Sequence, residues 1–244
     1  MFAQLNERHI TKSKVRKYRE TLKLFDKREQ INEFKVIKND LEEVHFCNET
    51  LEIKTKGDKL YIEERSFAKI SSDFIMNYEL DYIKIKFCEI ELYIVEEENK
   101  KLKLPFVGIA RQNKIFTEND EGTIQHELQH CFENLLGISY LFNSWEREYT
   151  AYLTEMIFSN SKEGLDSIYN EVLRNNWNDE TEKYYDNEVH YKARLQIVSD
   201  LLDLWVDKKS SEEQIKQVAL ILLDRIYKKK TGMSYEEIMN EVKK

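Results

Sequence analysis

The segment Thr123-Ile124-Gln125-His126-Glu127-Leu128-Gln129-His130-Cys131-Phe132 contains the pattern HExxH and is the most informative feature of this chain. If the segment is helical, His126 and His130 are one turn apart and project from the same face. Two imidazoles at this spacing can bind one Zn²⁺. Glu127, about 100° further round the helix, can reach a water molecule beside the metal without being a ligand. The pattern therefore predicts a metal-binding helix.

The residues around the motif indicate how this helix packs. Its apolar side chains fall on the side away from the two histidines: Ile124, Leu128, Cys131, Phe132 and Leu135. We therefore expect one face of the helix to pack in a core, with Cys131 as a core thiol, and the other to line a cleft. The alternative is an ordinary amphipathic helix with two surface histidines.

Two histidines make an incomplete site, because catalytic zinc usually takes three protein ligands and a water. The metzincin pattern is absent, since Glu133 and Leu136 occupy the positions of its glycine and third histidine. A glutamate from the following helix is the other option. Gly137 is a plausible helix end, and Ser144 is a candidate N-cap of a second helix that could return a carboxylate to the histidines.

The second helix begins Ser144-Trp145-Glu146-Arg147-Glu148-Tyr149-Thr150-Ala151. HExxH followed by such a glutamate, with a small residue three positions later, resembles the gluzincins, the thermolysin- and neprilysin-like zinc metallopeptidases. The small HExxH proteins of bacteria and their mobile elements are also similar. The resemblance covers about residues 104–160 and implies a zincin-like fold, Zn²⁺ as cofactor and Glu148 as third ligand. Glu146 is close enough to compete, and Tyr152 stands where many relatives have a histidine-orienting Asp.

The resemblance also implies hydrolysis of peptide bonds in a protein or peptide substrate. Glu127 would act as general base, and a tyrosine or a downstream histidine would stabilise the oxyanion. His190 is the first candidate for that role, although it could equally be a plain helix-surface histidine. The tyrosine candidates are Tyr149, Tyr152 and Tyr185. A dedicated regulatory or toxin-like protease is the favoured function, and a catalytically inactive zinc-stabilised scaffold for a partner protein is the alternative.

Composition limits the other function classes. The chain has 244 residues, of which 41% are hydrophobic and 12% aromatic, enough for a substantial core. Its net charge of −8 argues against general binding of nucleic acid. We find no apolar run of membrane-spanning length and no signal-peptide pattern in the first nine residues, so we expect a cytoplasmic protein without a membrane partner.

The pattern of apolar residues predicts an α+β fold with a β-rich N-terminal half and a mostly helical C-terminal half. We expect a helical arm over residues 1–34 and one domain over residues 35–244, with a β-rich part at 35–120 and a helical part at 121–244. Phe106–Arg111 and Gln112–Thr117 are expected to form two strands leading into the HExxH helix, with an edge open to an extended substrate. Further strands are expected at 44–47, 51–55, 60–62, 83–87, 90–95 and 102–110, with a short helix at 67–76. Further helices are expected at 144–159, 162–175, 180–206, 212–229 and 234–242.

Overall fold

The computed structural model describes the backbone of residues 36–37, 45–47, 51–56, 59–65, 75–87, 90–95, 108–111, 113–118, 120–174 and 185–243. In this part of the chain the strands lie in the N-terminal portion and six α-helices in the C-terminal portion, so the α+β prediction is confirmed at that level. The chain divides into two compact units, with a boundary between Asp120 and Glu121. That residues 35–244 form one domain stays a prediction. The arm at 1–34 and most of the helix at 67–76 fall outside the described residues, and Ile75 and Met76 begin a strand instead.

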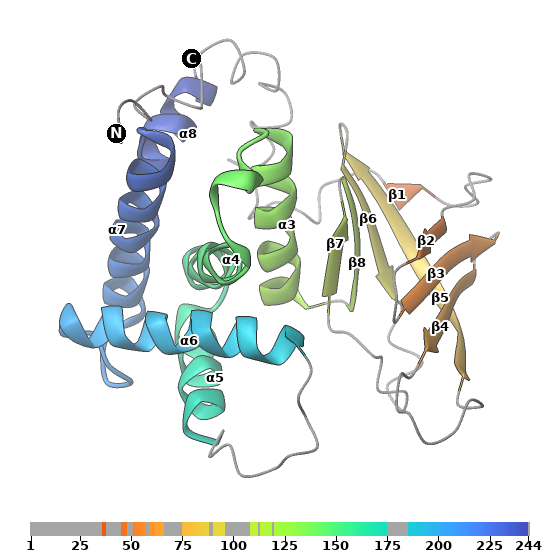
Figure 1. Cartoon of the computed structure of the whole chain (residues 1–244), viewed down its shortest axis with the longest axis horizontal. Coiled ribbons are helices and arrows are strands. Elements are labelled where there is room, and N and C mark those ends of the chain that lie inside the picture. Colours follow the sequence, from red (N-terminus) through yellow and green to blue (C-terminus); the bar gives the residue numbers. More distant parts are fainter. Residues whose placement is uncertain are drawn as a thin grey trace, which may run out of the picture. The chain divides into compact units, whose positions relative to one another are not determined.

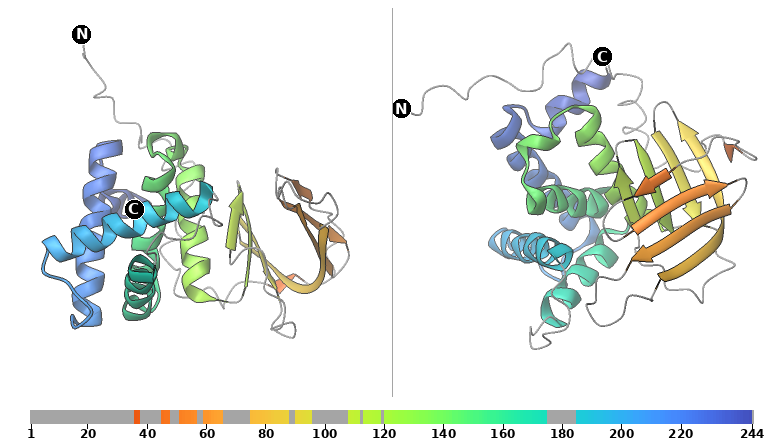
Figure 2. Two further views of the ribbon diagram at one scale, coloured as in Figure 1. Left: turned by 60° about the horizontal axis from the view of Figure 1, so that its bottom comes forward. Right: turned by 45° about the vertical axis from the view of Figure 1, so that its right-hand side comes forward.

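The N-terminal unit is a mostly antiparallel sheet (Figure 1). Its strand order is β2-β3-β4-β5-β6-β8-β7, with β1 paired to β5. The strands are β1 (Val36–Ile37), β2 (His45–Cys47), β3 (Leu51–Lys56), β4 (Lys59–Arg65), β5 (Ile75–Phe87), β6 (Ile90–Val95), β7 (Gly108–Arg111) and β8 (Lys114–Glu118). β5 is long and has several partners: its first half pairs with β4, and its second half pairs with β6 and, at Lys84 and Ile85, with β1. The curvature of β5 is visible in Figure 2.

Alternation of apolar and polar residues accounts for the described strand cores. Ile53 and Leu60 are fully buried on β3 and β4, and Tyr93 stacks on Phe116 across the parallel pair β6 and β8. The predicted strands before the HExxH helix are present as the antiparallel pair β7 and β8. In the described part of the sheet β7 has a neighbour on one side only, so it is an edge strand.

The C-terminal unit is built around α4, which packs against α3, α5, α6 and α7. Figure 1 shows α4 end-on, between α3 and α7. The helices are α3 (Glu121–Leu135), α4 (Ser144–Phe158), α5 (Ser161–Arg174), α6 (Tyr185–Asp203), α7 (Glu212–Thr231) and α8 (Tyr235–Lys243). Among the described residues, no helix combines the length and apolar character needed to cross a bilayer.

Local sequence chemistry sets the turn between α3 and α4. Gly137 has φ 64°, the left-handed conformation that glycine adopts without strain. The N–H of Gly137 bonds the Asn134 carbonyl, and the N–H of Ile138 bonds the Glu133 carbonyl, which is the Schellman pattern of a helix end. The predicted helix end at Gly137 is therefore confirmed. A 3₁₀ turn, η3 (Ser139–Leu141), leads to the next helix.

The start of α4 corrects one prediction: the N-cap is Asn143, not Ser144. The Asn143 side chain accepts a hydrogen bond from the Glu146 N–H, and the Glu146 carboxylate accepts one from the Asn143 N–H. This reciprocal capping box satisfies two backbone donors at the helix start. It fixes where α4 begins and therefore which way its later side chains point.

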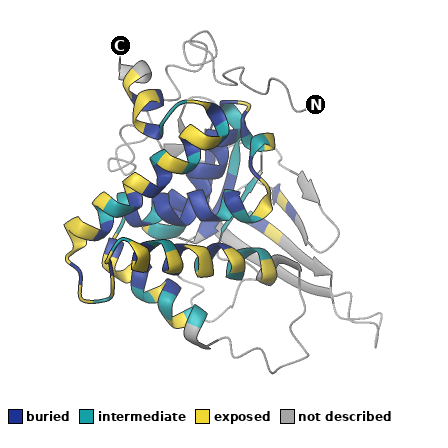
Figure 3. Ribbon diagram, turned by 60° about the vertical axis from the view of Figure 1, so that its left-hand side comes forward, coloured by how far each residue is buried: buried dark blue, intermediate teal, exposed yellow. Residues whose placement is uncertain are grey.

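α3 is buried on every side along most of its length. All ten residues from Ile124 to Glu133 are buried, including the polar ones, and Figure 3 shows such buried segments in dark blue at the centre of the helical unit. The predicted packed face is present: Leu128, Cys131 and Phe132 have at most 2% exposure. The opposite face is also covered. Because buried polar groups need partners, the polar residues of α3 must be paired by neighbouring helices.

Candidate metal centre

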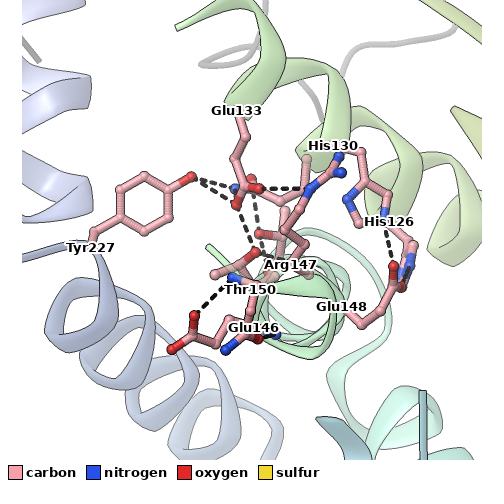
Figure 4. A network of polar contacts seen from close by, with 11 residues as sticks. His126, His130, Glu133, Glu146, Arg147, Glu148, Thr150 and Tyr227 are labelled. Carbon is pink, nitrogen blue, oxygen red and sulfur yellow. Dashed lines mark hydrogen bonds and ion pairs between the residues drawn. The ribbon is translucent and has the colours of Figure 1, made fainter. Parts of the chain in front are cut away.

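His126 and His130 of α3 face Glu148 of α4, as Figure 4 shows. The His126 Nε2 atom lies 3.0 Å from Glu148 Oε2, and the His130 Nε2 atom lies 3.4 Å from Glu148 Oε1. One ligand atom from each of the three residues falls within 4.8 Å of the other two. These three side chains therefore form a group that could hold a metal ion.

The two candidate glutamates differ in where their side chains lie. Glu146 is buried in its capping box, and its Oε2 also accepts a hydrogen bond from the Lys230 Nζ of α7 at 2.6 Å. Glu148, two residues later, lies about 200° further round α4 and so faces α3. Of the two, only Glu148 belongs to the group around the histidines.

The three side chains are strongly coupled electrostatically. Burial alone would lower the pKa of His126, but its contacts with the carboxylates of Glu148 and Glu155 outweigh burial and raise the pKa to about 10. Burial would raise the pKa of Glu148, but the two histidines outweigh it and hold that pKa well below its usual range. In this state His126 is protonated and pairs with the ionised Glu148. A bound metal ion would replace that proton as the positive charge beside Glu148, since a histidine must be neutral to be a ligand.

His190 reaches the same site from α6. Its Nδ1 atom lies 3.3 Å from Glu148 Oε2 and 3.0 Å from the hydroxyl oxygen of Tyr152. The rings of His190 and His126 are stacked, with 6.3 Å between their centroids. With 35% of its side chain exposed, His190 is more open than the three candidate ligands. The structure thus brings His190 beside the three candidate ligands, and its role stays a prediction.

The other sequence candidates divide into those near the site and those away from it. Tyr152 packs its ring edge-on against His126, with 4.7 Å between centroids. Tyr149 instead donates a hydrogen bond to Asp200 of α6 at 2.6 Å. Cys131 is fully buried, and burial raises the pKa of its thiol, so it is a core residue as predicted. The side chain of Tyr185 lies outside the described residues.

Glu127 follows His126 on α3 and is itself buried, with 7% exposure. Its charge acts on His126, since it contributes to raising the pKa of that histidine. This is the helix position that the sequence predicted for a residue beside the site rather than a ligand.

A buried polar network adjoins the candidate ligands, and its extent was not predicted from the sequence. The Glu133 Oε1 atom accepts hydrogen bonds from Gln129 of α3, Thr150 of α4 and Tyr227 of α7 (Figure 4). The Gln129 side chain also donates a hydrogen bond to the Tyr227 hydroxyl oxygen and accepts one from the Thr154 hydroxyl. The only sequence signal was the i, i+4 spacing of Gln129 and Glu133 on a helix with apolar flanks. Their partners come from helices distant in sequence.

The donor atoms fit a divalent transition metal. Two imidazole nitrogens and one carboxylate oxygen, on buried side chains, form a donor set typical of catalytic zinc sites. Comparison of the chain with models of protein families, with curated proteins and with solved structures gave no match. The assignment of this site therefore rests on its geometry and on the residues themselves.

Proposed function

We propose that this protein is a zinc-dependent peptidase of the gluzincin type, acting on a protein or peptide substrate. One observation carries the proposal: His126 and His130, one turn apart on α3, converge with Glu148 from the next helix. Glu127 follows His126 in the same motif, and a purely structural metal site would not require it. The zincin-like fold and a cytoplasmic location belong to this proposal.

The division of roles follows from the positions of the side chains. A bound Zn²⁺ would supply Lewis acidity and lower the pKa of a water toward about 7. Glu127 would take a proton from the attacking water and pass it to the leaving amine. The Nδ1 atom of His190 is engaged by Tyr152 and Glu148, so its Nε2 is the atom that we assign to the substrate oxyanion.

The substrate is proposed to be one dedicated regulatory or host protein rather than proteins in general. The candidate ligands are nearly covered, with 7% exposure of His126 and 8% of His130. A site with so little open surface favours a substrate that is admitted selectively over general digestion. An edge strand open to an extended substrate stays a prediction of this proposal, and β7 has a neighbour on one side only in the described part of the sheet.

The same burial favours a second candidate function, a zinc-stabilised scaffold without catalysis. His190 lies close enough to Glu148 to serve as a fourth protein ligand, and a site closed by four protein ligands is structural rather than catalytic. In that case zinc would contribute to folding, and Glu127 would have no chemical role.

Glu127→Gln separates the two functions. With zinc-loaded full-length protein and a peptide library as substrate, the peptidase proposal predicts cleavage by the wild type. In Glu127→Gln we expect cleavage to be slower by about 10²- to 10⁴-fold, because a general base contributes about this much. The zinc content, measured by mass spectrometry, should be unchanged in the variant.

Glu121→Gln is the matched control, since it removes the same charge from an exposed position in the first turn of the same helix. It should cleave at the wild-type rate. Wild-type cleavage that persists in Glu127→Gln, or zinc-loaded wild type that cleaves nothing, would decide for the scaffold.

A further inference from the structure

Both ring nitrogens of His126 face carboxylates of α4. Nε2 lies 3.0 Å from Glu148, and Nδ1 lies 3.6 Å from Glu155 Oε2. Glu148 and Glu155 are seven residues apart, so they project from the same side of the helix about two turns apart. The His126 ring is therefore held between two acidic side chains from one helix, one on each of its nitrogens.

Of the neighbouring side chains Glu155 and Tyr152, Glu155 is the one whose polar atom lies beside His126 Nδ1. Tyr152 lies between the two glutamates in sequence and packs against His126 through its ring, not through its hydroxyl. That hydroxyl is hydrogen-bonded to His190. The separation of 3.6 Å between Glu155 and Nδ1 is an ion-pair distance, slightly longer than a hydrogen bond, and a small side-chain movement would close it.

His130 is placed differently. Its Nδ1 atom is buried and has no hydrogen-bond partner in the part of the chain that the structure describes. His126, by contrast, has a carboxylate at the nitrogen turned away from Glu148. The two histidines of the motif are therefore not equivalent.

We propose that Glu155 is a positioning residue, whose carboxylate accepts the Nδ1–H of His126 and keeps its Nε2 turned toward the metal ligands. A histidine that binds a metal through one nitrogen commonly donates its other N–H to a carboxylate, which fixes the ring and its tautomer. This inference rests on the metal site of the proposed function but not on its catalytic step. The HExxH motif gives no sign of Glu155, which lies 28 residues beyond Glu127.

The test measures zinc affinity of the full-length protein by competition with a chelator. Removal of such a partner typically weakens metal binding about 10- to 100-fold, so we expect a loss in this range for Glu155→Ala. Glu155→Gln keeps the shape of the side chain and a weaker acceptor, and its loss should be smaller. Glu163→Gln on α5 removes the same charge from a carboxylate that hydrogen-bonds Asn160, and it should bind zinc like the wild type.

A second measurement follows the Nδ1–H proton of His126 directly. In the zinc-loaded wild type, the Nδ1–H proton of His126 should be visible by NMR and protected from exchange with solvent. In Glu155→Gln this proton should exchange faster, even if Glu155→Ala proves too unstable to study. A change in folding alone would not single out this proton.

Each result bears on the inference. Wild-type zinc affinity in both Glu155 variants, or unchanged exchange of the His126 proton, would overturn it, as would a wild type that binds no zinc. Weakened zinc binding in these variants, together with undiminished cleavage by Glu127→Gln, would support the role of Glu155 while removing the proposed peptidase mechanism.

Discussion

At the scale of single residues, two glutamates only two positions apart have different tasks. Glu146 closes the capping box at the start of α4 and pairs with Lys230, whereas Glu148 faces the histidines. Both are substantially buried, so burial does not distinguish them. The helical rotation between them does, since it turns one toward α7 and the other toward α3.

This difference predicts separate effects of the two substitutions. Glu148→Ala should abolish zinc binding at stoichiometric concentrations, because it removes one of three ligands. Glu146→Ala should keep one zinc per chain and instead lower the free energy of unfolding by about 1–3 kcal/mol, because the Asn143 N–H loses its acceptor in the capping box and Lys230 loses its buried partner. Metal analysis beside urea unfolding distinguishes these outcomes. Loss of zinc from a fully folded Glu146→Ala protein would contradict the ligand assignment.

At the scale of helices, α3 carries two sets of polar residues with different partners. One set, His126 and His130, faces Glu148; the other, Gln129 and Glu133, bonds to α4 and α7. Tyr227 is fully buried on α7 and reaches both residues of the second set. The network thus joins three helices beside the candidate ligands, and we expect it to hold α3 and α4 in register.

Glu133 should give this network a pH dependence. Burial raises the pKa of Glu133 above 4.5, and the nearby His130, Thr150 and other donors offset this only in part. The folded protein therefore keeps this proton over a pH range in which the unfolded chain has lost it. Stability consequently falls as the pH rises from about 4.5 through the raised pKa of the folded state.

Glu133→Gln cannot titrate and should lack this decrease. Urea unfolding of metal-free wild type and Glu133→Gln at a series of pH values isolates the contribution, because all other groups titrate in both proteins. The stability difference between the two should change with pH in favour of the variant as the pH rises above 4.5. A difference that stays constant with pH would show that Glu133 is ionised in the fold.

The helices show what the sequence could and could not predict. The spacing of apolar residues predicted both ends of four helices to within about two residues: α4, α5, α7 and α8. These predictions succeeded because each helix has one strongly apolar stripe and recognisable ends. At α4, however, Asn143 is the cap in place of the predicted Ser144. Asn143 and Ser144 have similar capping ability. The Glu146 side chain decides between them, because it completes the capping box with Asn143.

The candidate site was predictable to the extent that it is local in sequence. His126 and His130 follow from helical spacing alone, and Glu148 came from the resemblance, with Glu146 still open. Glu155, Tyr227 and the position of His190 depend on how α4, α6 and α7 pack against α3. Packing angles between helices arise from the fit of many side chains, and no local pattern encodes them.

At the scale of the whole molecule, every candidate ligand and positioning residue lies in the helical unit, in its part from Glu121 onward. The ligands come from α3 and α4, so a bound metal would link two helices that already pack together. The sheet unit contributes none of these residues. Metal removal should therefore act on one unit more than on the other.

Chelation gives the prediction at this scale. A ligand that binds only the folded state stabilises it by about 4 kcal/mol when its free concentration is 1,000 times its Kd, and zinc removal should withdraw stabilisation of this order. In hydrogen exchange with mass spectrometry, EDTA should reduce protection in Glu121–Leu135 and Ser144–Phe158. Protection in Leu51–Lys56 and Lys59–Arg65 of the sheet should change much less. Glu148→Ala is the control, since its exchange should not respond to EDTA. A response spread evenly over both units, or one that persists in Glu148→Ala, would mean that the metal acts at some place other than His126, His130 and Glu148.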